Sequence, residues 1–224
     1  MTPHNMQNDL FARQDMAGPW PELLGPQTML LHGYALQAET ALLAALKTVT
    51  ATAPLRHMVT PGGFIMSVAM TNCGALGWVS DRHGYRYQDR DPISGREWPA
   101  MPTAFEKLAS AAAAAAGFDG FQPDACLVNC YTIGNRLTLH QDKNERDFSH
   151  PIVSVSLGMP AVFIFGGLKR SDKTRRVSLV HGDVVVWGGA DRLRYHGVLS
   201  LKPHPFRHSL LEDQRINLTF RHAG

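Results

Sequence analysis

The sequence predicts a mostly β protein with flanking helices, an α+β chain built on a two-sheet barrel or jelly roll. From residue 124 onward, short runs of Val, Ile, Leu and Phe alternate with polar residues and are separated by Gly, Pro and Asp turns. Short strands at such close spacing are typical of two packed antiparallel sheets. The chain has 224 residues, of which 44% are hydrophobic and 18% are charged, as expected for one globular domain with a substantial core.

The N-terminal part is expected to supply helices that support the sheets. Residues 1–25 contain prolines and polar residues with little periodicity, and they are predicted to form a loose extension. Residues 39–50 have the apolar spacing of an amphipathic helix. A second, alanine-rich helix is predicted to begin at Thr103, which would form a capping box with Glu106, and to end at Gly117.

The predicted strands follow the second helix without an internal repeat or a linker, so residues 124–224 are expected to form a single catalytic core. The strands are expected at residues 125–131, 136–140, 152–157, 161–165, 177–180, 183–187, 195–199 and 215–221.

Composition excludes several classes of protein. Three cysteines without a CxxC motif indicate neither a disulfide framework nor a thiolate zinc site, so a reducing cytoplasm is expected. No apolar run is long enough to cross a bilayer, and the N-terminus lacks the pattern of a signal peptide. We therefore expect no membrane partner, and we expect a monomer.

The charge of the chain is only weak evidence for the kind of molecule that it binds. The net charge is only +3, but basic residues flank the segments that carry the candidate site. This distribution suits a groove that follows nucleic-acid phosphates, although scattered surface charge explains it as well. The basic residues are Arg82, Arg86, Arg136, Lys143, Lys169, Arg170, Lys173, Arg175 and Arg176.

The motif His140-Gln141-Asp142 carries the first chemical signal. Side chains alternate along an extended strand, so positions 140 and 142 would point the same way. With His196 from a distant strand, they would form the two-histidine, one-carboxylate set of non-haem Fe(II) oxygenases. Three other histidines could replace His196 in that set, and they are His181, His204 and His208.

The segment 215–221 carries the second signal, because it reads as a strand with one apolar and one polar face. The polar face holds Arg215, Asn217, Thr219 and Arg221. Two arginines on one face of a strand have two explanations. The face is exposed to solvent, or it binds a dianion, because guanidinium pairs well with carboxylate. A dicarboxylate between this strand and an iron site suggests 2-oxoglutarate.

Further motifs occur in order from about residue 55 to the C-terminus. They include Asn72-Cys73-Gly74, Asn129-Cys130-Tyr131, His140-Gln141-Asp142-Lys143, Phe165-Gly166-Gly167-Leu168-Lys169-Arg170 and Tyr195-His196-Gly197. With the 215–221 strand, this series resembles the bacterial AlkB family of Fe(II)- and 2-oxoglutarate-dependent dealkylases. The resemblance implies a double-stranded β-helix core, with residues 55–100 as a substrate-recognition lid. It also favours His196, within Tyr-His-Gly, over the other histidines.

The resemblance also implies residue roles and a reaction. His140, Asp142 and His196 would bind Fe(II), and Arg215 would pair with the distal carboxylate of 2-oxoglutarate. Asn129, Tyr131, Asn217 and Arg221 would complete the co-substrate site. With O₂, the enzyme would hydroxylate the N-methyl group of a damaged base such as 1-methyladenine or 3-methylcytosine. Succinate, CO₂ and formaldehyde would be released.

Alkylated DNA, with a preference for single strands, is the implied partner, and RNA is a further candidate substrate. Trp78 would stack on the cationic methylated base, with Met70 against the base, Tyr85 on a phosphate and Arg170 near the pocket. Asn144 departs from the family, which has an acidic residue there, so discrimination between damaged adenine and cytosine is expected to change. Two rival functions are a 2-oxoglutarate-dependent hydroxylase of protein or a small molecule, and a non-catalytic nucleic-acid-binding module.

Overall fold

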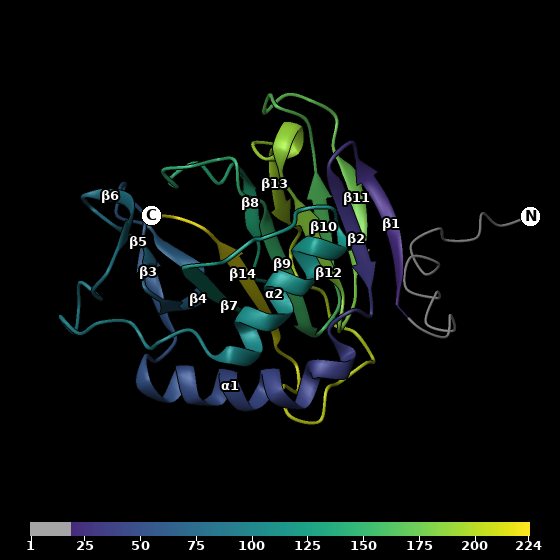
Figure 1. The fold of residues 1–224 in the computed structure, drawn as a ribbon. Coiled ribbons are helices and arrows are strands. Elements are labelled where there is room, and N and C mark those ends of the chain that lie inside the picture. Colours follow the sequence, from purple (N-terminus) through teal and green to yellow (C-terminus); the bar gives the residue numbers. More distant parts are fainter. Residues whose placement is uncertain (1–18) are drawn as a thin grey trace, which may run out of the picture.

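Two β-sheets that face each other form the centre of the molecule in this computed structural model, which describes residues 19–224 (Figure 1). The larger sheet has eight strands in the order β1-β2-β12-β9-β14-β7-β4-β3, and the smaller sheet has the order β11-β10-β13-β8. Strands β5 and β6 form a separate two-stranded sheet. The neighbouring strands are antiparallel throughout, which confirms the predicted jelly-roll core.

The strands of the predicted core lie close to their expected positions. They are β7 (Ala125–Tyr131), β8 (Leu137–His140), β9 (Ile152–Gly158), β10 (Ala161–Phe165), β11 (Arg175–Leu179), β12 (Val184–Trp187), β13 (His196–Val198) and β14 (Arg215–Arg221). Strand β14 lies between β7 and β9 in the middle of the larger sheet.

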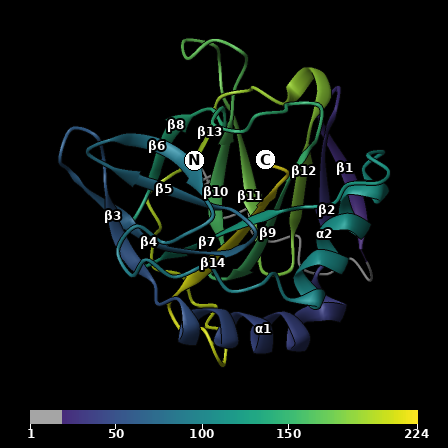
Figure 2. The same ribbon diagram turned by 60° about the vertical axis from the view of Figure 1, so that its left-hand side comes forward.

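Strands that precede the predicted core extend the larger sheet at both edges. They are β1 (Trp20–Gly25), β2 (Thr28–His32), β3 (Arg56–Val59) and β4 (Ile65–Gly74), and the small sheet consists of β5 (Gly77–Asp81) and β6 (Gly84–Gln88). The expectation of a loose extension over residues 1–25 is therefore wrong for Trp20–Gly25, which pairs with β2, whereas residues 1–18 lie outside the described residues. Figures 1 and 2 place β3, β5 and β6 at the end of the molecule opposite β1.

Two helices cover the outer face of the larger sheet. Helix α1 (Glu39–Thr52) follows a short 3-10 turn, η2 (Leu36–Ala38), and runs along the edge of the molecule below α2 (Thr103–Ala115) in Figure 1. Their apolar faces share one core cluster with side chains of the larger sheet, including Leu42, Phe105 and Phe220. None of the helices in the described part of the chain is both long and apolar enough to cross a membrane.

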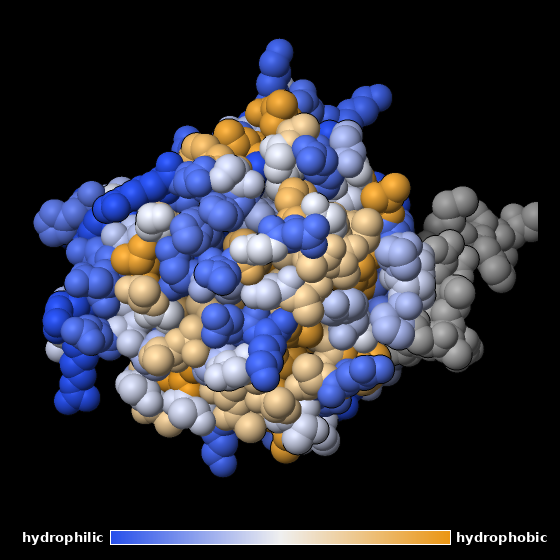
Figure 3. Space-filling view, viewed as in Figure 1, coloured by the Kyte–Doolittle hydropathy of each residue, from blue (hydrophilic) through white to orange (hydrophobic). Residues whose placement is uncertain are grey.

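The expectation that Thr103 caps α2 is wrong. Thr103 is the first helical residue, and the extended Pro102 precedes it as N-cap without any side-chain hydrogen bond. The N–H groups of Phe105 and Glu106 instead donate to the Pro102 carbonyl. Gly117, at φ +86°, ends the helix as expected. Figure 3 shows light-orange surface over this alanine-rich helix, in keeping with the exposed alanines at 111, 114 and 115.

A second core cluster fills the space between the two sheets at one end. It contains Leu30, Ile152, Phe163 and Trp187, all of which are buried. The cavity described below is lined by members of this cluster and of a third cluster, which includes Met70, Leu127 and Tyr131. Strand β4 pairs with β7 over Ala69–Gly74, so this part of residues 55–100 belongs to the main sheet itself.

Two glycines with nearly the same backbone conformation provide a test of the packing at the end of β4. Gly74 (φ +114°) would place an added Cβ 2.3 Å from the Asp124 carbonyl oxygen, whereas Gly84 (φ +116°) has nothing within 4 Å of that point. Both alanine variants should lose about 1–3 kcal/mol of unfolding free energy through backbone strain. Gly74→Ala should lose about 1–3 kcal/mol more from the clash. Urea unfolding measures both, and equal losses would contradict this packing.

Candidate active site

A single cavity of about 400 Å³ gathers the site residues that the sequence predicts. Its walls come from β4, β7 and β14 of the larger sheet, from β8, β10 and β13 of the smaller sheet, and from β5 and β6. The predicted residues that line it are Met70, Trp78, Tyr85, Asn129, Tyr131, His140, Asp142, Asn144, Arg170, His196, Arg215, Asn217 and Arg221. His181, His204 and His208 are not among its lining residues.

The histidine pair and Asp142 converge at one wall. His140 ends β8 and is the register partner of His196, the first residue of β13. Asp142 places one carboxylate oxygen 3.6 Å from His140 Nε2 and the other 3.6 Å from His196 Nε2. Residues 140 and 142 face the same point, as expected, although Asp142 lies beyond β8, which ends at His140.

The backbone around the histidines orients both rings. His140 Nδ1 lies 2.8 Å from the Thr138 carbonyl oxygen, and His196 Nδ1 lies 3.0 Å from the Arg194 carbonyl oxygen. A carbonyl can only accept, so each Nδ1 carries the proton and each Nε2 keeps a free lone pair. This arrangement is typical of metal-binding histidines.

Electrostatics keep His140 and Asp142 in the protonation states that a metal needs. Burial and the neighbouring His196 lower the pKa of His140 to about 4, so the imidazole is neutral near pH 7. Burial alone would raise the pKa of Asp142, but Arg221 and the two histidines hold it well below its usual range. Two imidazoles and one carboxylate are the ligand set that suits Fe(II).

A buried ion-pair network supports Asp142 from behind. Arg221 donates to Asp142 Oδ2 through Nη2 (2.6 Å) and Nε (3.2 Å), and its Nε also lies 3.2 Å from Glu145 Oε1. Arg192 lies 3.2 Å from the other oxygen of Glu145 and donates to the Asp142 backbone carbonyl at 2.8 Å. Tyr87 of β6 donates to Glu145 at 2.8 Å. Tyr87, Glu145 and Arg192 belong to no local sequence motif, so the sequence does not predict their part in the site.

Arg215 occupies the opposite part of the cavity without an acidic partner. It is 1% exposed, and its two hydrogen bonds go to neutral acceptors, Ser156 Oγ at 2.8 Å and the Met159 carbonyl at 3.4 Å. Its Nε has no hydrogen-bond partner among the described residues. Burial lowers the pKa of Arg215 to about 10, which leaves it charged at neutral pH. A buried cation of this kind calls for an anion from outside the chain.

Polar side chains from three strands surround Arg215. Tyr131 lies directly opposite it in the β7–β14 register, and Asn129 lies opposite Asn217. Asn217 accepts from Asn129 at 3.3 Å and from Thr219 at 2.8 Å, so it orients Asn129. Burial raises the pKa of Tyr131 to about 12, so its hydroxyl keeps its proton and can donate.

Aromatic side chains form the mouth of the cavity. The Trp78 and Tyr85 rings are stacked, with centroids 5.6 Å apart and planes at 13°. Trp78 Nε1 donates to Asn144 Oδ1 at 3.2 Å, and the Trp78 backbone is held by two hydrogen bonds with Asn72. Met70 is 1% exposed and forms part of the lining, while Arg170 donates to the Leu139 carbonyl at 2.7 Å.

Comparisons with known proteins place this geometry in a family. The model of the 2OG-Fe(II) oxygenase superfamily matches residues 27–221. The chain belongs to the 2OG-Fe(II) oxygenase superfamily. It is 54% identical to the alpha-ketoglutarate-dependent dioxygenase AlkB of Escherichia coli over 216 residues, 96% of this chain and 98% of that protein, so it is also a member of the AlkB family.

Other relatives act on nucleic acids or share the fold. The nucleic acid dioxygenase ALKBH1 of Mus musculus is 37% identical over 131 residues, which are 58% of this chain and 33% of that protein. The solved structure of OsALKBH1 superimposes with a TM-score of 0.78 at 30% identity, covering 90% of this chain and 99% of that one. The chain is thus an iron- and 2-oxoglutarate-dependent dioxygenase of the AlkB family.

The residues around the cavity fit the Fe(II) and 2-oxoglutarate that the superfamily uses. His140, Asp142 and His196 supply the free donor atoms for the metal. At the other end, the unpartnered Nε of the buried Arg215 suits the distal carboxylate of the co-substrate. The two features lie in the same cavity, as a ligand that bridges them requires.

Replacing Arg215 should separate co-substrate binding from stability. Arg215→Met puts an unbranched apolar side chain in place of the arginine. It therefore removes a buried charge that has no acidic partner among the described residues. We expect the KM for 2-oxoglutarate to rise by at least tenfold, while the unfolding free energy stays equal or increases. Steady-state kinetics and urea unfolding measure the two quantities. An unchanged KM together with a large loss of stability would make Arg215 a structural residue only.

Proposed function

We propose that this enzyme removes N-alkyl groups from nucleobases in DNA, with 1-methyladenine and 3-methylcytosine as substrates and with single strands preferred. The observation that carries this proposal is one cavity that joins the His140, Asp142 and His196 set to the aromatic pair of Trp78 and Tyr85. A small-molecule oxygenase does not require stacked aromatic rings at its mouth, whereas a reader of flat bases does.

The reaction joins two oxidations. The methyl group on the ring nitrogen takes up one atom of O₂ and becomes hydroxymethyl, while 2-oxoglutarate takes up the other and becomes succinate and CO₂. The bound Fe(II) would supply the O₂ activation for both. The hydroxymethyl group then leaves as formaldehyde when its carbon–nitrogen bond breaks, and the base regains its normal form.

The protein's own residues would position the two reactants. Arg215 would bind the distal carboxylate of 2-oxoglutarate, with Tyr131 as a hydroxyl donor and Asn129 oriented by Asn217. Arg221 would hold Asp142 ionised and in place. These roles follow from burial, charge and hydrogen-bond geometry around the cavity.

The base would enter between the aromatic mouth and the metal set. A base methylated at N1 or N3 is a cation, which stacks favourably on indole. Such an atom is inaccessible inside a duplex, so the base must be flipped out or come from a single strand. Met70 and Arg170 would lie beside the base, and the 46% exposed Tyr85 would reach the backbone. Two parts of the sequence expectation, a monomeric state and a role for residues 55–100 as a lid, remain predictions.

Turnover on a defined oligonucleotide tests the function. A single-stranded oligonucleotide with one 1-methyladenine should yield succinate and formaldehyde in equal amounts when Fe(II) and O₂ are present. His140→Ala and Asp142→Ala should abolish both products and the binding of Co(II) at the site, with circular dichroism unchanged. His83→Ala serves as the control, because this 87% exposed side chain lies on the surface.

Other outcomes would overturn the proposal. Succinate formation that methylated DNA does not stimulate would indicate a hydroxylase of protein or a small molecule. Binding of the oligonucleotide without any turnover would indicate a non-catalytic module. Near wild-type activity of either alanine variant would remove that residue from the metal set.

Asn144 is expected to affect the choice of base. The indole N–H of Trp78 is a donor only, so it engages the Asn144 oxygen and leaves the amide NH₂ as the group available to the base. An aspartate would accept from Trp78 and also from the exocyclic amine of adenine or cytosine. Asn144→Asp should therefore change the ratio of rates on 1-methyladenine and 3-methylcytosine and speed turnover of these cationic bases. Identical ratios in parallel single-turnover assays would refute this.

A further inference from the structure

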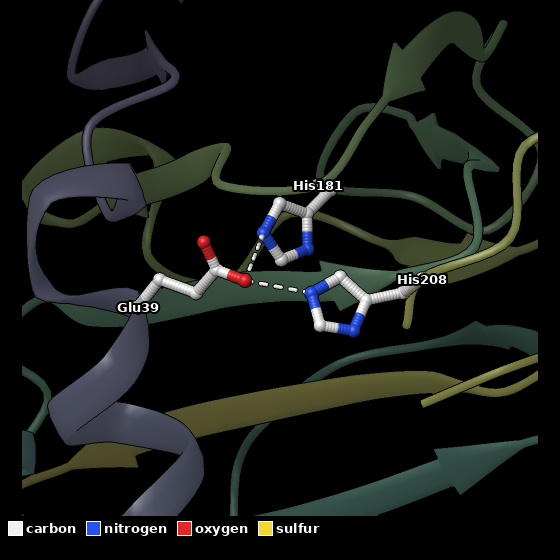
Figure 4. Close-up of side chains that lie close together, drawn as sticks. All are labelled: Glu39, His181 and His208. Carbon is white, nitrogen blue, oxygen red and sulfur yellow. Dashed lines mark hydrogen bonds and ion pairs between the residues drawn. The ribbon is translucent and has the colours of Figure 1, made fainter. Parts of the chain in front are cut away.

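A second group of two histidines and a carboxylate lies outside the cavity lining (Figure 4). Glu39 is the first residue of α1, His181 lies in the turn before β12, and His208 lies in the segment that leads to β14. His208 Nε2 is 2.6 Å from Glu39 Oε1, and His181 Nε2 is 3.5 Å from the same oxygen. The two imidazoles are stacked, with centroids 4.8 Å apart.

The backbone around these rings is incompatible with metal binding. The Gly158 N–H donates to His181 Nδ1 at 2.9 Å, and the N–H groups of Leu210 and Leu211 lie 3.2 Å from His208 Nδ1. Each Nδ1 therefore accepts, and each neutral ring carries its proton on Nε2. No lone pair remains there for a metal, in contrast to His140 and His196, whose Nδ1 atoms face carbonyls.

The protons on Nε2 of His181 and His208 explain the role of Glu39. His208 Nε2 lies within hydrogen-bond distance of Glu39 Oε1, and His181 Nε2, which has no hydrogen-bond partner among the described residues, lies 3.5 Å from the same oxygen. The hydrogen bond from His208 lowers the pKa of Glu39, and burial lowers the pKa of His181. Both shifts favour an ionised Glu39 carboxylate beside a neutral His181 imidazole.

One arm of the cluster leads through His181 to Arg215. Gly158, which donates to His181, lies opposite Arg215 in the β9–β14 register. The adjacent Met159 accepts from Arg215 through its carbonyl at 3.4 Å and donates its N–H to Gln214 at 2.9 Å. Gly158 (φ +82°) packs so closely here that an added Cβ would lie 2.2 Å from the Gln214 carbonyl oxygen.

The other arm leads through His208 to the same arginine. His208 holds the N–H groups of Leu210 and Leu211, and the Leu211 carbonyl accepts from Gln214 N–H at 2.9 Å. Gln214 directly precedes Arg215, the first residue of β14. Both arms thus end on the residues that flank Arg215, and Glu39 joins them at their origin.

We propose that Glu39, His181 and His208 are positioning residues that hold Arg215 in place for 2-oxoglutarate. The proposal rests on the co-substrate role of Arg215 given above. Arg215 itself makes only two hydrogen bonds, both to neutral acceptors, so its placement depends on the backbone that carries it. We call the two hydrogen-bonded arms together the lock. Their hydrogen bonds fix the backbone segments next to Arg215 from the far side of the sheet, and so hold Arg215 in position.

Direct binding of 2-oxoglutarate to the Mn(II)-loaded enzyme tests the lock without a nucleic-acid substrate. Calorimetry should show the Kd for 2-oxoglutarate about tenfold higher in Glu39→Ala, with Mn(II) affinity and circular dichroism unchanged. Glu39→Gln keeps an acceptor oxygen and should restore most of the affinity. Glu22→Ala is the matched control, because Glu22 also contacts a histidine, His32 at 3.0 Å, and pairs with Arg175, but neither of these residues belongs to the two arms. Its Kd should equal that of the wild type.

Arg215→Met separates failure of the lock from failure of the co-substrate site. If Arg215→Met weakens 2-oxoglutarate binding and Glu39→Ala does not, the lock is refuted while the site stands. If neither variant weakens binding, the co-substrate role of Arg215 fails as well.

Nitrogen NMR of the imidazoles provides a readout that a general loss of stability would not change. His181 and His208 should show the Nε2–H tautomer, and His140 and His196 the Nδ1–H tautomer. Co(II) added to the His140→Ala variant, which lacks the first site, should leave the His181 and His208 signals unchanged. Co(II)-induced shifts of these two signals would identify a second metal site and overturn the proposal.

Discussion

Strand β14 buries a polar face in the middle of the larger sheet, and most of the site is organised around that constraint. The backbone of the strand is paired on both sides, and its polar side chains line the cavity between the sheets. The two arginines meet the constraint in different ways. Arg221 is neutralised within the chain by Asp142 and Glu145, whereas Arg215 has only neutral acceptors. In the proposed function, Arg221 would therefore hold the metal ligand Asp142 in place, and Arg215 would remain available to a bound anion.

Two histidines and one carboxylate come together twice in the described part of the chain, and the backbone decides what each set does. Where a carbonyl accepts a hydrogen bond from Nδ1–H, Nε2 keeps a lone pair that can bind a metal. Where a backbone N–H donates to Nδ1, Nε2 carries the proton and donates a hydrogen bond instead. His140 and His196 face carbonyls, and His181 and His208 face N–H groups. Residue identity and proximity alone do not distinguish the two sets. The peptide groups around them do.

Sequence patterns were sufficient where the determining interactions are local or periodic. The two-residue period of 215–221 predicted which side chains share the cavity, and His-x-Asp with Tyr-His-Gly located the metal set. Strands β1 and β2 were missed because their partners are each other and the distant β12. The Glu145–Arg192 contact and the Glu39 cluster join residues far apart in the chain, so no spacing reveals them. Thr103 was misassigned because Pro102 already sets the extended residue before the helix.

The segment from His140 to Glu145 faces the metal position and four protein side chains within six consecutive residues. His140 and Asp142 face the metal position, Asn144 binds the indole of Trp78, and Glu145 joins Arg192, Arg221 and Tyr87. Neighbouring residues thus carry separate tasks in a strict order, without a spacer between them. A substitution can alter one task and leave the others intact, as at residue 144. An insertion or deletion cannot, because it would displace every later partner at once. Residue 144 is therefore free to vary in chemistry, whereas the segment is not free to vary in length.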